Sequence, residues 1–258
     1  MTKSEGSMVN HSEVIAESAQ RYIDEVAQAE KAGDEQFFFW FDNASTLEQY
    51  FDNGVRTLEG EILTEKVRNA LGSTENASAL EIGHGGGGGR ILSAACGKFQ
   101  HVSGIDVHRS NEPVKRRLSD AGIDNYTLHS TDGTSIPAGI SDLDFVYSYI
   151  VLMHIPSMET FRQYISETFR VLRPGGVAQL FYGRYSRMSW KARLRWYLPG
   201  YREISKAKTD YTSLVITRRT AHKIAREAGF TVLDSGSSLR PDGKQKGIQN
   251  FMTLQVPK

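Results

Sequence analysis

Apolar and polar positions change their spacing repeatedly after residue 78, from the period of a strand to that of a helix and back. Extended character is found at 79–82, 101–106, 126–130, 143–149 and 177–182, and helical character at 90–96, 113–121 and 158–172. This alternation predicts a parallel sheet covered by helices on both faces. After a helix at 220–229, strands at 230–234 and 251–256 can pair antiparallel, because no helix separates them.

Helical spacing also fills the first part of the chain. Apolar residues recur at intervals of three and four over 12–31 and again over 47–67, with an aromatic run at 37–41 between them. We interpret the run as core, and a lid over a ligand site is the alternative. The predicted fold is α/β: a Rossmann-like, doubly wound sheet of seven strands, mostly parallel with a C-terminal antiparallel hairpin, plus N-terminal helices. We expect a helical extension at 1–72 and one domain at 73–258.

Composition and charge exclude few functional classes. The formal net charge is +1 over 258 residues, which argues against a general attraction of the protein to nucleic acid or membranes. The single cysteine, Cys96, cannot form an internal disulfide and lies in an apolar stretch. No segment has the length of a membrane span, and the first residues lack the apolar core of a secretion signal. We therefore expect a cytoplasmic protein with no membrane span and no metal site.

The most informative segment is a glycine-rich turn after the first strand. Six of the seven residues at 83–89 are glycine, with Glu81 before them and His84 among them. Such a cluster is best explained by backbone that needs positive φ and that a ligand approaches closely. Ligands of this type of sheet bind beyond the carboxyl ends of the strands. The turn therefore indicates a cofactor loop, and a purely structural turn is the alternative.

A second acidic residue supports a nucleoside at this edge. Asp106 ends the second strand, 25 positions after Glu81. A carboxylate at that place can accept hydrogen bonds from both hydroxyls of a ribose. A dinucleotide dehydrogenase would use the residue in the same way, so Asp106 by itself does not choose between enzyme classes.

These features, in this order, resemble the class I S-adenosylmethionine-dependent methyltransferase family, of the type 11/25 kind, over roughly 78–258. Glu81 is followed by a G-x-G-x-G pattern and later by Asp106, as in that family. Its most specific motifs are the apolar stretch 147–156, which ends in His-Ile-Pro, and the Leu-Arg-Pro-Gly-Gly that begins at Leu172. A hydride-transfer enzyme has no physical need for this pair.

The resemblance implies S-adenosyl-L-methionine as the cofactor. The residues expected to bind it are Glu81, Gly83, His84, Gly85, Gly87, Asp106, Asp132, Gly133 and Ser148. Asp132 is the family's candidate for the adenine amino group, and an ordinary Asp-Gly turn is its alternative role.

Methyl transfer is a displacement at carbon, so holding the acceptor in line within a dry pocket can supply most of the acceleration. A catalytic base is optional. His154 is the best single candidate, because it lies just past the fourth strand and its ordinary pKa is near neutrality. The alternatives are that it orients its loop or contacts the cofactor.

A basic insert is expected at 184–217, leaving the fifth strand at the cofactor edge. Ten Lys and Arg residues stand against two acids over 183–219. The excess favours an acceptor with a carboxylate or phosphate, and a solvated insert is the alternative. The expected acceptor-binding residues are Arg193, Arg195, Trp196 and Tyr201.

The predicted function is methyl transfer to a small-molecule acceptor. RNA methylation would use the basic insert as a backbone-binding surface, but no recognisable RNA-binding module is present, so nucleic acid is not the expected partner. Two further alternatives are an NAD-dependent oxidoreductase on a related sheet and a binding protein that retains the pocket without turnover.

Overall fold

The computed structural model describes residues 44–85, 89–108, 111–185, 200–203, 212–239 and 246–258, with a few single positions between 20 and 32. Several predicted features lie outside the described residues: the aromatic run at 37–41, Gly87, Arg193, Arg195 and Trp196.

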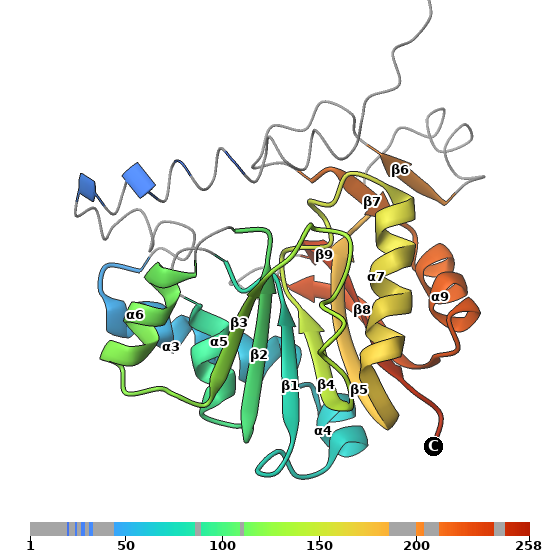
Figure 1. The fold of residues 1–258 in the computed structure, drawn as a ribbon. Helices are drawn as coiled ribbons and strands as arrows, with labels where there is room; N and C mark the ends of the chain where they lie inside the picture. Colours follow the sequence, from blue (N-terminus) through green and yellow to red (C-terminus); the bar gives the residue numbers. More distant parts are fainter. Residues whose placement is uncertain are drawn as a thin grey trace, which may run out of the picture.

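A seven-stranded sheet with the order β3-β2-β1-β4-β5-β9-β8 forms the centre of the described chain (Figure 1). Its strands are β1 Ser78–Ile82, β2 His101–Asp106, β3 Tyr126–Ser130, β4 Leu143–Ser148, β5 Leu172–Gly183, β8 Thr231–Leu239 and β9 Lys246–Gln255. Strands β1 to β5 pair in parallel, whereas β9 is antiparallel to both β5 and β8. The predicted fold class, including the C-terminal antiparallel pair, is confirmed.

Helices cover both faces of this sheet (Figure 1). One face packs against α5 Arg90–Cys96 and α6 Glu112–Asp120, and the other packs against α7 Met158–Val171 and α9 Arg218–Glu227. Along β1, Ala79 faces α5 while Leu80 faces the α7 side, and both are fully buried. Burial on both faces explains why the central strands have near-continuous apolar sequences.

The helical pattern expected over 47–67 is divided in the structure. It forms α3 Leu47–Thr57, a π-helical turn η2 Leu58–Ile62 and α4 Glu65–Leu71. The division falls at Thr64, whose hydroxyl accepts a hydrogen bond from the N–H of Val67 and begins α4. Because Leu58, Ile62 and Val67 are buried on the α5 side, the apolar spacing continues across the break and conceals it.

One feature was not expected from the spacing. A short antiparallel pair, β6 Tyr201–Glu203 and β7 Leu214–Ile216, stands apart from the main sheet. Residues 131–142, which connect β3 to β4, form no helix. Pro137 and Ile140 of this loop line a hollow together with Ser103 of β2 and His129 of β3.

Candidate cofactor site

The carboxyl ends of β1, β2 and β4 bring the predicted site residues to one edge of the sheet. The N–H of Gly83 donates to the carbonyl of Ile105 at 2.7 Å, which ties the start of the glycine loop to β2. The N–H of Gly85 donates to Oδ2 of Asp106 at 2.8 Å. Two predicted cofactor residues that are 21 positions apart are thus in direct contact.

The glycines of the loop have different physical roles. Gly83, at φ 81°, packs so tightly that a Cβ there would stand 2.2 Å from Cγ2 of Val151. Gly85, at φ 75°, has no atom of the described chain within 4 Å of its Cβ position. Gly83 is therefore required for packing, whereas Gly85 leaves an open face that a ligand can approach.

Asp106 is a buried carboxylate with two donors. It is 8% exposed, and the Nε2 of His108 lies 3.2 Å from its Oδ1. Burial lowers the pKa of His108, and His84 lowers it further, although Asp106 acts in the opposite direction. A neutral His108 that carries its proton on Nε2 is placed to donate to this carboxylate oxygen.

His84 lies between Gly83 and Gly85 with its imidazole buried. Its Nδ1 is 3.0 Å from the carbonyl oxygen of Gly85, which can only accept, so Nδ1 carries the proton in the neutral ring. Its Nε2 is buried and has no partner in the part of the chain that the structure describes. A Cβ at Gly104 would stand 2.8 Å from the His84 ring, so β2 needs glycine beneath it. Nε2 of His84 is therefore an acceptor that can take a hydrogen bond from a donor on a ligand.

Glu81 lies beneath the loop rather than beside the open face. It is 3% exposed, and the hydroxyl of Tyr147 donates to its Oε2 at 3.1 Å. Burial raises the pKa of Glu81 to about 8, against the effects of the Tyr147 hydrogen bond and the Arg90 charge. In this structure, Glu81 is thus mainly uncharged at neutral pH.

The other predicted residues are placed at the same edge, with local roles. Oδ1 of Asp132 accepts from the N–H groups of Thr134 and Ser135, at 2.8 and 3.0 Å, and closes the turn that continues through Gly133 at φ 80°. The Oγ of Ser148 is fully buried and has no partner among the described residues. The adenine role of Asp132 and the cofactor role of Ser148 remain predictions.

His154 and Tyr201 also remain predictions. The N–H of His154 donates to the carbonyl of Val151 at 2.8 Å, within the loop that follows β4. Tyr201, on β6, packs against the apolar core on the α7 side.

Three residues at this edge were missed by the sequence analysis. Tyr149 follows β4 directly, and its hydroxyl donates to Oε1 of Glu61 at 3.3 Å. Burial raises the pKa of Glu61, which comes from η2. The position of Tyr149 after a strand could have revealed it, and His108 stands only two residues after Asp106. Nothing in the sequence places Glu61 here, because its position depends on how the N-terminal helices pack.

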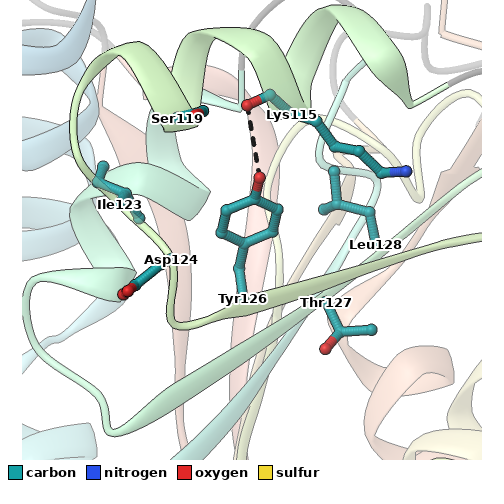
Figure 2. A pocket seen from close by; sticks show the side chains of 7 residues that line it. All are labelled: Lys115, Ser119, Ile123, Asp124, Tyr126, Thr127 and Leu128. Atoms are coloured by element: carbon teal, nitrogen blue, oxygen red, sulfur yellow. Dashed lines mark hydrogen bonds between the residues drawn. The ribbon is translucent and has the colours of Figure 1, made fainter.

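Two hollows border β3 and contain none of the predicted site residues. Figure 2 shows the one between α6 and β3, of about 460 Å³, where the Tyr126 hydroxyl donates to the carbonyl of Lys115 at 3.4 Å. The other, of about 360 Å³, lies under the 131–142 loop and is lined by Ser103 and His129 among others. Neither hollow adds to the cofactor edge.

The residues that the structure describes include no helix with the length and apolar character needed to cross a membrane. They also include no group of three or more His, Cys, Asp or Glu side chains arranged to hold a metal ion.

Comparison with known proteins identifies the domain. The family model for a methyltransferase domain matches residues 79–176. The fold is similar to 1,6-didemethyltoxoflavin-N1-methyltransferase of Burkholderia thailandensis, solved with 1,6-didemethyltoxoflavin and S-adenosylhomocysteine; identity is 15%, 100% of this chain and 94% of that chain are covered, and the TM-score is 0.61.

Two other solved structures have the same fold. One is a putative sarcosine dimethylglycine methyltransferase from Galdieria sulphuraria, at 15% identity, with 86% of this chain and 98% of that chain covered and a TM-score of 0.60. The other is an S-adenosylmethionine-dependent methyltransferase from Clostridium acetobutylicum, at 11% identity, with 86% and 97% covered and a TM-score of 0.57. Comparison with curated proteins gave no match.

The sequence match of the domain and the strand order agree with the family resemblance noted in the motifs, which is thereby confirmed. Residues 79–176 are therefore the methyltransferase domain of an enzyme, and the chain has the fold of S-adenosylmethionine-dependent methyltransferases, which agrees with the expected cofactor, S-adenosyl-L-methionine.

Proposed function

We propose that this enzyme methylates a small molecule, and that the glycine loop and Asp106 hold the cofactor. The observation that carries the proposal is the contact between the N–H of Gly85 and the Asp106 carboxylate, next to the open face of Gly85. A nucleoside on this face would meet backbone without side chains on one side and a buried carboxylate on the other.

The residues present fit this cofactor. It is a sulfonium nucleoside without phosphates, so its site needs closely approaching backbone and hydrogen-bond acceptors more than a phosphate-binding nest. Asp106 offers carboxylate oxygens for ribose hydroxyls. Nε2 of His84, which has no partner among the described residues, offers a further acceptor. When bound, the cofactor supplies an electrophilic methyl group.

The chain's own part in the reaction is positioning and exclusion of water. Tyr149, Phe181 and Phe251 form an aromatic row at the carboxyl edge, with ring centroids 4.9 and 5.8 Å apart. Ile150 holds a positive φ of 59°, uncommon for a β-branched residue, while its N–H donates to Gln249 at 3.1 Å. We propose that this edge shapes a dry acceptor pocket, in which alignment supplies most of the acceleration. If a base is used, His154 supplies it.

The acceptor class rests on two kinds of support. The Burkholderia neighbour was solved with a small-molecule substrate bound, and the present chain is covered over its whole length by that comparison. The basic composition of 184–217 favours an acceptor with a carboxylate or phosphate. We propose Arg193, Arg195, Trp196 and Tyr201 as its binding residues, and we retain 1–72 and 73–258 as the domain division.

Labelled methyl transfer tests this proposal. The enzyme is incubated with methyl-labelled S-adenosylmethionine and a cell extract divided into a low-mass fraction and an RNA fraction, with Asp106→Ala as the inactive control. Label is expected in low-mass compounds. Most of it should be found in those that carry a carboxylate or a phosphate. Label confined to RNA, or equal label with the Asp106→Ala protein, would overturn the proposal.

A further inference from the structure

We propose that His108 is a positioning residue for the cofactor's ribose, because it orients the Asp106 carboxylate so that one acceptor position on each oxygen remains for the two sugar hydroxyls. This inference rests on the proposed function, since it assumes that a nucleoside binds over the glycine loop.

Each oxygen of the Asp106 carboxylate faces one donor group of the protein. An ionised carboxylate has about four acceptor positions, two on each oxygen. An Nε2–H on His108, 3.2 Å from Oδ1, fills one of them, and the Gly85 N–H fills one on Oδ2 from 2.8 Å. The described residues supply no further donor to either oxygen, which leaves one position on each for the two donors of a vicinal diol.

Both donors are themselves held in place. The carbonyl of His108 accepts a hydrogen bond from Oγ of Ser130 at 2.6 Å, which ties the residue to the end of β3. Nδ1 of His84 contacts the carbonyl of Gly85 at 3.0 Å and so restrains the residue whose N–H reaches Asp106. The carboxylate is therefore oriented before a ligand arrives, which reduces the ordering cost of binding.

Burial makes this orientation consequential. Asp106 and His108 are 8% and 5% exposed, so water cannot readily replace a missing donor. Removing the His108 donor leaves a buried carboxylate oxygen short of a partner and free to turn away from the sugar. A neutral His108 can donate Nε2–H, and burial, which lowers its pKa, keeps it in that form.

Calorimetric titration with two ligands tests the inference. The ligands are S-adenosylhomocysteine and its analogue without the 2′ and 3′ hydroxyls. His108→Phe keeps a ring and removes the donor, while His108→Gln places an amide N–H near the original Nε2. His129→Phe, on β3 away from the loop, is the matched control.

His108→Phe should weaken binding of S-adenosylhomocysteine by about tenfold and leave binding of the dideoxy analogue unchanged. His108→Gln should restore most of the affinity, and His129→Phe should have no effect. Equal weakening of both ligands would show a merely structural role and overturn the inference, as would unchanged affinity for S-adenosylhomocysteine. If His108→Phe does not fold, His108→Met gives the same comparison. Absence of binding by the unaltered protein would instead contradict the proposed function.

Discussion

Alanine substitutions at three glycines with nearly equal φ can separate the effects of backbone strain, side-chain packing and ligand approach. Gly83, Gly85 and Gly122 have φ of 81°, 75° and 70°. Replacement by alanine costs each of them about 1–2 kcal/mol of folding free energy, because a Cβ disfavours this region. At Gly83 the new methyl would also meet Val151 at 2.2 Å, which adds about 1–3 kcal/mol of overpacking. No described atom lies within 4 Å of the Cβ position at Gly85 or Gly122.

The expected results therefore differ between stability and binding. In urea unfolding, Gly85→Ala and Gly122→Ala should lose about 1–2 kcal/mol, and Gly83→Ala should lose about 2–5 kcal/mol. In titrations with S-adenosylhomocysteine, Gly85→Ala should bind roughly 5- to 150-fold more weakly, because its methyl group occupies the ligand's face. Gly122→Ala should bind normally and serves as the control. Normal binding by Gly85→Ala would refute the assignment of that open face to the cofactor.

Three further results are expected. In unfolding curves measured from pH 5 to 8, Glu81→Gln should gain stability relative to the unaltered protein as pH rises. The native carboxyl has a pKa of about 8 against an ordinary 4.5, so the stability that its protonated form contributes is complete below pH 4.5 and is lost by about pH 8. The difference amounts to up to roughly 5 kcal/mol. Tyr147→Phe should lose about 1–3 kcal/mol and raise the pKa of Glu81 further, since the hydroxyl bond lowers it; an unchanged pH profile would contradict this. Gly54→Ala should destabilise the fold, because its Cβ would stand 2.1 Å from the carbonyl oxygen of Arg90. Gly60→Ala meets no described atom within 4 Å and should be neutral or up to about 1 kcal/mol stabilising.

The sheet could be predicted from the sequence because each of its strands has a local pattern. The strands ending at Asp106 and Ser130 were predicted with the bounds that the structure shows, since turns and apolar runs mark both ends. The glycine loop was equally plain, because a glycine cluster after a strand has few structural explanations. The contact between Gly85 and Asp106 then follows from the shared edge of parallel strands.

Contacts that depend on strand order or helix packing could not be predicted. Tyr147 reaches Glu81 only because β4 pairs with β1, although the two residues are 66 positions apart. The Tyr149–Glu61 contact depends on the position of η2. The break of the predicted 47–67 helix at Thr64 is hidden by continuous apolar spacing. Sequence reasoning placed Glu81 among the cofactor-binding residues, and its burial beneath the loop could not be predicted because that depends on the layers above and below the strand.

The central claim is that the cofactor lies over the glycine loop with its sugar held by Asp106. Calorimetric titration of the unaltered protein and Asp106→Asn with S-adenosylhomocysteine, and with NAD as a control ligand, tests it most directly. We expect one S-adenosylhomocysteine site in the unaltered protein, at least about tenfold weaker binding in Asp106→Asn, and no heat with NAD. Equal affinity in the two proteins, or no heat with S-adenosylhomocysteine from folded protein, would contradict the account.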